Sequence, residues 1–220
     1  MEHRIVTLAD QIMERIEKDI LSGKYVRDEI LNEQRISKDL GVSRTPVREA
    51  LKRLEQEHFL EETGHGLKVV GITKEDMIDY YAIRIRVEPL AAGNCAKYAD
   101  EEALASIGEA LEMQEYYLKK EEEEGVDYSE KIKDYDSLFH ELIYRNCRSN
   151  AYMDTLVPIH KKMTKYRKAS VRKVSRAHDS VAEHREIYTA LKERDAEGAG
   201  ELIRKHIANA RDSVAATEEE

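Results

Sequence analysis

Residues 41–54 constrain the fold of this chain most strongly, because the two faces of this segment carry different kinds of side chain. Apolar residues recur at the spacing of one helix face, and they are Val47, Ala50, Leu51 and Leu54. Arg44 and Arg48 step along another face. Ser43 or Thr45 is placed to cap the first free N–H groups. We therefore predict a helix that begins near Arg44, with one face buried and the other basic.

A shorter helix precedes this one. Asn32 is suited to cap it, Ile36 and Leu40 give it a buried side, and Gly41 ends it by accepting a left-handed conformation. Two such helices form a helix-turn-helix, in which the second helix presents its first residues to base edges in the major groove. An arginine there can bind guanine or a phosphate. The alternative is an ordinary helical hairpin with a solvated basic face.

Two strand-like runs follow the basic helix. Residues 59–62 and 67–70 flank the turn Thr63-Gly64-His65-Gly66, a pattern that predicts a β-hairpin, or wing. The two glycines would let the backbone at His65 approach a sugar-phosphate chain closely. The alternative is a surface hairpin whose tip binds nothing.

The composition fits a mainly helical chain of two domains. Among 220 residues there are only 3 Pro and 10 Gly, whereas 37% are charged and 41% are hydrophobic. The formal net charge is −9, but residues 1–72 hold only 12 basic and 14 acidic residues, so most of the acidity lies in the second part. Within residues 42–54 basic side chains outnumber acidic ones, so DNA binding should be strongly salt-dependent.

The sequence changes character at residues 71–76, where β-like residues give way to a helix that Thr73 can cap. We expect a winged helix-turn-helix domain over residues 1–72 and an all-helical bundle of six to seven helices over residues 73–220. The first domain also holds an amphipathic helix, whose apolar stripe is Ile5, Leu8, Ala9, Ile12, Ile16 and Ile20. Expected bundle helices span residues 77–98, 101–124, 129–145, 150–170, 178–193 and 195–214.

Cys95 and Cys147 are too few and too isolated for a disulfide framework or a thiolate metal site, so we expect reduced core residues. No N-terminal apolar segment and no run of membrane-spanning length is present. The expected location is therefore cytoplasmic, with no membrane anchor.

The second half carries side chains at metal-ligand spacing. Asp136 and His140 are four residues apart and share a helix face. His184 and His206 lie at similar distances on either side of the turn near residue 194, so they should sit at one level of a helical hairpin. One carboxylate and three imidazoles suit a divalent ion, Zn²⁺ first, or Ni²⁺, Co²⁺ or Mn²⁺. The alternative is a set of ordinary core or capping histidines.

Residues 40–51, which read LGVSRTPVREAL, resemble the signature of the GntR family of bacterial transcription regulators. The resemblance implies DNA contacts from Arg44, Thr45 and Arg48 in the recognition helix. It also implies contacts from Gln34, and from His65 and Gly66 at a wing tip that reaches the minor groove. Two positions depart from the family pattern: Gln34 replaces a common arginine, and His58 replaces a glycine.

The motifs around His140, His184 and His206 resemble the metal-binding pattern of the FCD effector domain found in FadR-type members of that family. His160 and His178 match no position of that pattern. Arg84, four residues before Glu88, corresponds to an arginine that points into the bundle cavity of such domains. A cationic fork beside a metal suits a small organic acid as effector. The alternative is a surface ion pair between Arg84 and Glu88.

These patterns favour a ligand-responsive transcription regulator that binds double-stranded operator DNA as a homodimer. A metal-dependent hydrolase or lyase is the competing hypothesis, since a metal at this site could activate water. No further Glu or His is placed as a general base, and an enzyme has no need of the helix-turn-helix, so we expect no enzyme activity. A purely structural metal is a third possibility. The sequence leaves open the effector, the operator, the metal and the direction of regulation.

Overall fold

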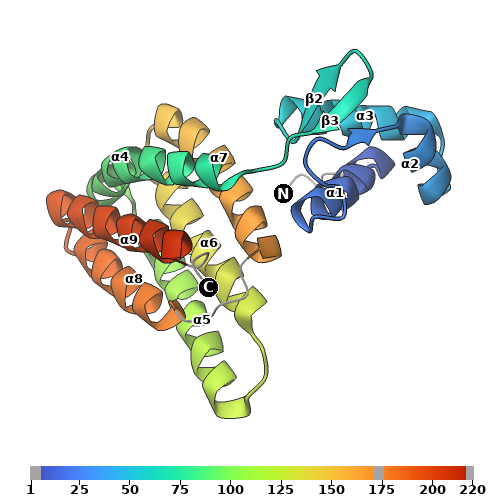
Figure 1. Ribbon diagram of the computed structural model, residues 1–220. Helices are drawn as coiled ribbons and strands as arrows, with labels where there is room; N and C mark the ends of the chain where they lie inside the picture. Colours follow the sequence, from blue (N-terminus) through green and yellow to red (C-terminus); the bar gives the residue numbers. More distant parts are fainter. Residues whose placement is uncertain (1–5, 171–175, 217–220) are drawn as a thin grey trace. The chain divides into compact units, whose positions relative to one another are not determined.

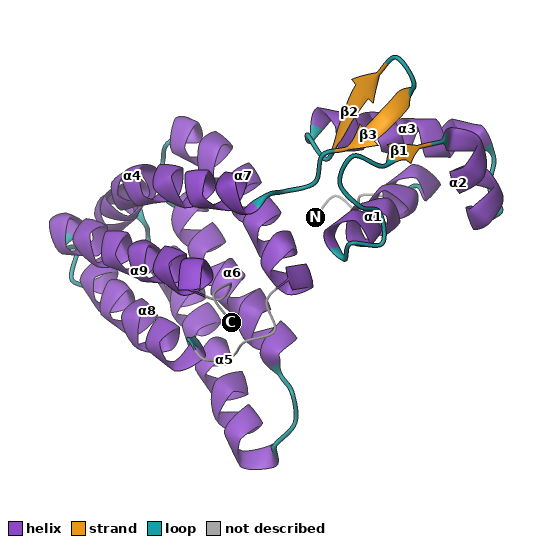
Figure 2. Cartoon of the chain, viewed as in Figure 1, coloured by secondary structure: helices purple, strands orange, loops and turns teal. Residues whose placement is uncertain are grey.

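The computed structural model describes residues 6–170 and 176–216, and within those ranges it contains nine helices and three short strands (Figure 1). The chain divides into two compact units, Met1–Thr73 and Lys74–Glu220. Helices dominate and the small sheet belongs to the first unit (Figure 2). The predicted fold class, a winged helix-turn-helix followed by a helical bundle, is confirmed. No described helix is both long and apolar enough to cross a bilayer.

The first helix, α1 (Leu8–Leu21), begins at a reciprocal capping arrangement. The Thr7 hydroxyl accepts from the N–H of Asp10 at 3.1 Å, and the Asp10 carboxylate accepts from the N–H of Thr7 at 2.8 Å. Buried Ala9, Ile12, Ile16 and Ile20 confirm most of the predicted stripe. Leu8 is exposed, and Ile5 lies outside the described residues.

The helix-turn-helix consists of α2 (Glu33–Leu40) and α3 (Arg44–Gln56). Asn32 caps α2 as predicted, because its Oδ1 accepts from the N–H of Gln34 at 2.8 Å. Gly41 ends α2 with a φ of 67°. The predicted side-chain cap of α3 is wrong: Ser43 occupies the cap position, but its exposed side chain makes no cap hydrogen bond.

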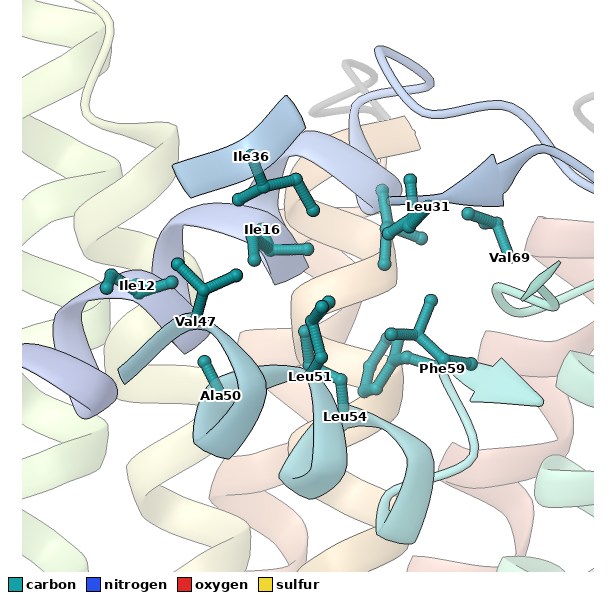
Figure 3. Close-up of a cluster of buried hydrophobic side chains, with 12 residues drawn as sticks. Ile12, Ile16, Leu31, Ile36, Val47, Ala50, Leu51, Leu54, Phe59 and Val69 are labelled. Atoms are coloured by element: carbon teal, nitrogen blue, oxygen red, sulfur yellow. The ribbon is translucent and has the colours of Figure 1, made fainter. Parts of the chain in front are cut away.

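One hydrophobic core joins these three helices to the sheet (Figure 3). The predicted buried face of α3 is confirmed, because none of its four apolar residues is more than 1% exposed. They pack among apolar side chains from the other elements, including Ile12, Ile16, Leu31, Ile36, Phe59 and Val69. Burying each large aliphatic side chain contributes about 1.5–3 kcal/mol to the folded state. This core fixes the orientation of the opposite, basic face of α3.

The wing consists of β2 (Leu60–Thr63) and β3 (Gly66–Val69), which pair antiparallel as predicted. A third strand, β1 (Ile30–Leu31), pairs with the outer side of β3 and was missed, because two residues carry no readable alternation. Gly66 allows this close pairing: a Cβ at that position would lie 3.1 Å from Cγ2 of Ile30. His58, at the family's glycine position, has a φ of 61°, a left-handed conformation that is unfavourable for non-glycine residues.

The second unit contains α4 (Lys74–Tyr98), α5 (Glu101–Glu124), α6 (Ser129–Arg145), α7 (Asn150–Ser170), α8 (Ala177–Lys192) and α9 (Ala196–Ala216). The long helix α4 packs against α9, and two glycines bring the two backbones together. A Cβ at Gly93 would lie 3.0 Å from the carbonyl oxygen of Ala196, and one at Gly200 would lie 3.2 Å from that of Pro89. Helix α5 packs against α6 and α8, and α8 packs against α9. Cys95 and Cys147 are buried and form no disulfide, as expected.

The two cap positions of the helix-turn-helix should respond differently to substitution. Asn32→Ala removes two hydrogen bonds at the start of α2 and should lower the free energy of unfolding by about 1 kcal/mol. Ser43→Ala removes no such bond and should change it by less than about 0.5 kcal/mol. Equilibrium urea unfolding of both variants measures the difference. An equal or larger loss for Ser43→Ala would contradict this account.

Candidate metal centre and DNA-binding face

Three histidines from three helices meet inside the second unit. His140 comes from α6, His184 from α8 and His206 from α9, and each is at most 3% exposed. Their Nε2 atoms lie 3.2, 3.2 and 3.3 Å from one another. The sequence predicted all three of these residues as metal ligands, and the fold brings their ring nitrogens to one point.

The opposite ring nitrogen of each histidine faces an oxygen atom. Nδ1 of His206 lies 2.7 Å from Oε2 of Glu183, and Nδ1 of His184 lies 2.9 Å from Oε1 of Gln114. Nδ1 of His140 lies 3.4 Å from Oε2 of Glu88, without hydrogen-bond alignment. Because the oxygens of Glu183 and Gln114 only accept, they favour a proton on Nδ1 of His206 and of His184. A neutral imidazole has one N–H, so Nε2 of His184 and Nε2 of His206 each keep a lone pair, and these two atoms face each other and Nε2 of His140.

The protonation states agree with this arrangement. Burial lowers the pKa of His206 to about 4, and burial together with the neighbouring imidazole of His206 holds the pKa of His184 well below its usual range. Burial alone would raise the pKa of Glu183, but hydrogen bonds from His206, Arg176 and Asn209 lower it to about 2. At neutral pH, His184 and His206 are therefore neutral, and Glu183 is a carboxylate.

This geometry fits a divalent cation. Nitrogen atoms held tetrahedrally at ~2.0–2.1 Å from a zinc ion are separated by about 3.3 Å, close to the spacing of these three Nε2 atoms. A cation between them would also remove the repulsion among their lone pairs. Carboxylate and amide groups behind the imidazoles are the usual outer partners of metal-binding histidines.

Asp136, the fourth predicted ligand, lies beside the triad. Its Oδ1 is 3.9 Å from Nε2 of His184 and accepts hydrogen bonds from Ser180 at 3.1 Å and from Gln114 at 3.4 Å. The side chain of Asp136 is 15% exposed, whereas that of His184 is fully buried. The structure therefore brings three of the four predicted ligands together, and Asp136 lies outside that cluster, 3.9 Å from one of its nitrogens.

Several residues that support the site were not predicted. Arg176 and Asn209 both hydrogen-bond the carboxylate of Glu183, at 2.6 Å each, and so hold it against His206. Gln114 links His184 to Asp136. The sequence shows Gln114 only as a glutamine in the middle of an expected helix. Its role cannot be recognised without knowing which face of α5 is buried. Arg176, Asn209 and Ser180 carry no sequence signal.

Arg84, the predicted effector ligand, is 2% exposed and forms a buried ion pair with Glu88. The alternative, a surface ion pair between Arg84 and Glu88, is therefore wrong, because the pair forms but is buried. Burial alone would lower the pKa of Arg84, but the charge of Glu88 raises it above its ordinary value. Because Glu88 also faces His140, the guanidinium is connected to the triad through one carboxylate. The buried hydroxyls of Tyr81 and Tyr144 have no hydrogen-bond partner in the described part of the chain.

The two remaining histidines considered in this half lie outside the triad. His160 is buried, and its ring is 5.5 Å from that of His140 and 5.7 Å from that of Tyr144. His178 is exposed, with Nε2 3.0 Å from the Glu122 carboxylate. Neither belongs to the cluster of converging ring nitrogens.

The predicted DNA-contacting residues lie on the first unit. Arg44, Thr45 and Arg48 are exposed in the first turns of α3, opposite its buried stripe. Gln34 is exposed at the start of α2. His65 is exposed at the wing tip, and Gly66 begins β3. Arg44 and Arg48 both contact the carboxylate of Glu33, a partner that the sequence did not indicate.

Comparisons with known proteins agree with both units. Residues 8–69 match the description "Bacterial regulatory proteins, gntR family", and residues 79–209 match the FCD domain. The HTH-type transcriptional regulator YdhC of Bacillus subtilis, itself uncharacterized, is 29% identical over 90% of this chain and 86% of its own length. The gluconate operon transcriptional repressor of the same organism is 32% identical over 57% of this chain and 49% of its own length.

Solved structures share the fold. McbR/YncC of Escherichia coli superposes with a TM-score of 0.71 at 21% identity, covering 96% of this chain and 98% of that one. Lar, which controls the agr system of Listeria monocytogenes, superposes with a TM-score of 0.73 at 16% identity, covering 98% and 100%. The chain belongs to the GntR family of bacterial regulatory proteins, with a helix-turn-helix segment followed by an FCD domain, and is a DNA-binding transcription regulator rather than an enzyme.

Proposed function

We propose that this regulator binds a pseudopalindromic operator as a homodimer, and that its helical domain holds a divalent metal ion and a small carboxylate effector that changes operator affinity. The observation that carries the proposal is the convergence of three buried imidazole nitrogens, the Nε2 atoms of His140, His184 and His206, within 3.3 Å of one another. Buried nitrogen lone pairs without a partner are unfavourable, and the carboxylate of Asp136, 3.9 Å from Nε2 of His184, adds negative charge beside them.

His140, His184 and His206 would hold the metal, and Asp136 would complete the set after a small rotation. Zn²⁺ suits this ligand set best, and Ni²⁺, Co²⁺ or Mn²⁺ are the other candidates. When bound, the ion supplies a Lewis-acid site for an oxygen of the effector. Glu183 and Gln114 would hold the rings of His206 and His184 in the orientation that a metal needs, and Glu88 faces the ring of His140 at 3.4 Å.

Arg84 and the two tyrosines next to it support a polar effector. A buried hydroxyl without a partner costs about 1–3 kcal/mol, and an oxygen-rich ligand would satisfy that of Tyr81. The same ligand would reach the hydroxyl of Tyr144, which already interacts with Glu88 and Arg84. Nη1 of Arg84 has the thioether of Met163, 3.9 Å away, as a weak acceptor that a carboxylate oxygen would replace. A small organic acid, such as a hydroxy acid, has the right groups. One relative, the gluconate operon transcriptional repressor of Bacillus subtilis, is named for an operon of a small hydroxy acid, which is consistent with an effector of this class.

The first unit supports operator binding through two surfaces. Arg44, Thr45 and Arg48 lie where a recognition helix contacts bases, and Gln34 lies in the first turn of the preceding helix, α2. His65 and Gly66 at the wing would contact the adjacent minor groove. One helix-turn-helix reads one half-site, so a two-fold homodimer is needed for specific affinity. The protein would act in the cytoplasm, where the bacterial chromosome lies.

Replacement of the recognition-helix arginines tests DNA binding. Arg44→Ala and Arg48→Ala should each weaken binding to the preferred duplex by about 1–3 kcal/mol, because each removes a forked donor from the exposed face of α3. Band-shift titration at fixed salt measures the loss, and light scattering should find two chains per duplex. Arg145→Ala, in α6 of the second unit, is the matched control. Unchanged affinity for both recognition-helix variants, or one chain per duplex, would contradict the proposal.

Replacement of a central histidine tests the metal. His184→Ala should abolish retention of a stoichiometric divalent metal, because it removes one of three converging nitrogens, while DNA binding is kept. Elemental analysis after purification without chelators gives the metal content. His178→Ala, which removes an exposed histidine outside the cluster, should keep the metal. Wild-type protein that neither retains nor rebinds a metal would refute the metal site. A metal that is retained without any effect of small acids on DNA binding would indicate a purely structural ion.

A conservative change at Arg84 separates the effector from the metal. Arg84→Lys keeps a positive charge next to Glu88, so it avoids the cost of about 3–5 kcal/mol for an unpaired buried carboxylate. It loses the planar fork, so binding of a small acid should weaken at least about tenfold while the metal is kept. Calorimetric titration with a panel of small hydroxy acids, including gluconate, measures this. Equal acid affinity in wild type and variant would remove Arg84 from the effector site.

A further inference from the structure

Glu33 connects the two arginines that face the DNA. Its Oε1 accepts from Nε of Arg48 at 3.0 Å, and its Oε2 accepts from Nη2 of Arg48 at 3.1 Å and from Nη2 of Arg44 at 3.3 Å. The carboxylate therefore forms a two-pronged pair with one guanidinium and shares an oxygen with the other. These side chains remain partly open, with exposed fractions of 27% for Glu33, 53% for Arg44 and 64% for Arg48.

The position of Glu33 favours this arrangement. It is the first residue of α2, immediately after the Asn32 cap, where the partial positive charge of the helix end stabilises a carboxylate. Hydrogen bonds from Arg48 and Arg44 hold the pKa of Glu33 below its ordinary range, so the group is charged at neutral pH. The carboxylate comes from one helix of the motif and the arginines from the other, so the pair also links α2 to α3.

The contact with Glu33 uses only some of the N–H donors of each arginine. Each guanidinium has five N–H donors. Glu33 takes two from Arg48 and one from Arg44, which leaves donors on the exposed edges of both groups. The same carboxylate cancels one of the two positive charges of the pair. A free arginine would bind any phosphate, whereas an arginine fixed by Glu33 has a set direction and a reduced net charge.

We propose that Glu33 is a specificity-determining residue of the DNA-binding face, which fixes Arg44 and Arg48 for base recognition and opposes their binding to phosphates of unrelated DNA. On a preferred sequence, the remaining donors meet base acceptors in the orientation that Glu33 sets, so the ion pairs are kept. On other sequences, an arginine reaches a phosphate only by leaving Glu33 or by bringing the carboxylate close to the DNA backbone. Both are unfavourable. This inference rests on the DNA-binding function proposed above.

The test uses Glu33→Gln, which keeps the shape of the side chain and removes its charge. Wild-type protein first selects duplexes from a random 30-base-pair pool, and one enriched duplex and the unselected pool then serve as probes. Glu33→Gln should bind the unselected pool about 3–10-fold more tightly and the enriched duplex no more tightly than wild type does. The ratio of the two affinities should therefore fall at least about threefold. The salt dependence of binding to the pool should steepen by about one phosphate contact.

Asp39→Asn is the matched control, because it removes one negative charge from the same helix without touching Arg44 or Arg48. Asp39 is 58% exposed and lies 3.8 Å from Arg35. It should leave the affinity ratio within about twofold of the wild-type value. An equal fall of the ratio in both variants would reduce the effect to net charge and overturn the inference, as would an unchanged ratio in Glu33→Gln. If wild-type protein enriches no sequence, the DNA-binding function fails as well, which separates the two results.

Discussion

The second unit is organised around three buried imidazole rings whose Nε2 atoms converge. His140, His184 and His206 come from α6, α8 and α9, and the groups behind them come from α4, α5 and α8. Five helices therefore have to dock correctly before the cluster exists. Burying this many polar groups is expensive unless each has a partner, and the oxygens of Glu183 and Gln114 supply partners on the outer side of two of the rings. On the inner side, the proposed divalent cation would be a partner for all three rings.

The first unit distributes its positive charge in a different way. Four basic residues cluster in α3, but the structure divides their roles. Arg53 pairs with Asp10 of α1 and with Glu49, so it fixes α3 against its neighbour. Arg44 and Arg48 lie on the outer face and share Glu33. The positive charge on the outer face at the start of α3 is thus carried by two arginines whose direction Glu33 sets.

Patterns in the sequence indicated the helix-turn-helix, the wing and the three histidines, and the family resemblance favoured these interpretations over their alternatives. The stripe from Val47 to Leu54 and the equal spacing of His184 and His206 about a turn depend on helix geometry alone. Three features could not be predicted. They are the burial of the Arg84–Glu88 ion pair, the hydrogen bond between Gln114 and His184, and the ion pair between Glu33 and Arg48. Each depends on which faces of distant helices meet. Glu33 and Arg48 are 15 positions apart in the sequence, and Gln114 and His184 are 70 positions apart. Strand β1 was too short to leave any pattern.

Helix α4 offers a direct route from the proposed metal and effector site to the DNA-binding unit. It begins at Lys74, where the first unit ends, and it carries Arg84 and Glu88. Glu88 faces both Arg84 and His140, so a carboxylate that approached Arg84 would compete for the same guanidinium and weaken the hold of Glu88. A ligand can shift an equilibrium only by the difference in its affinity for two states. Here that difference would arise on α4 itself, at the Arg84–Glu88 pair, in the helix that directly follows the DNA-binding unit in the sequence.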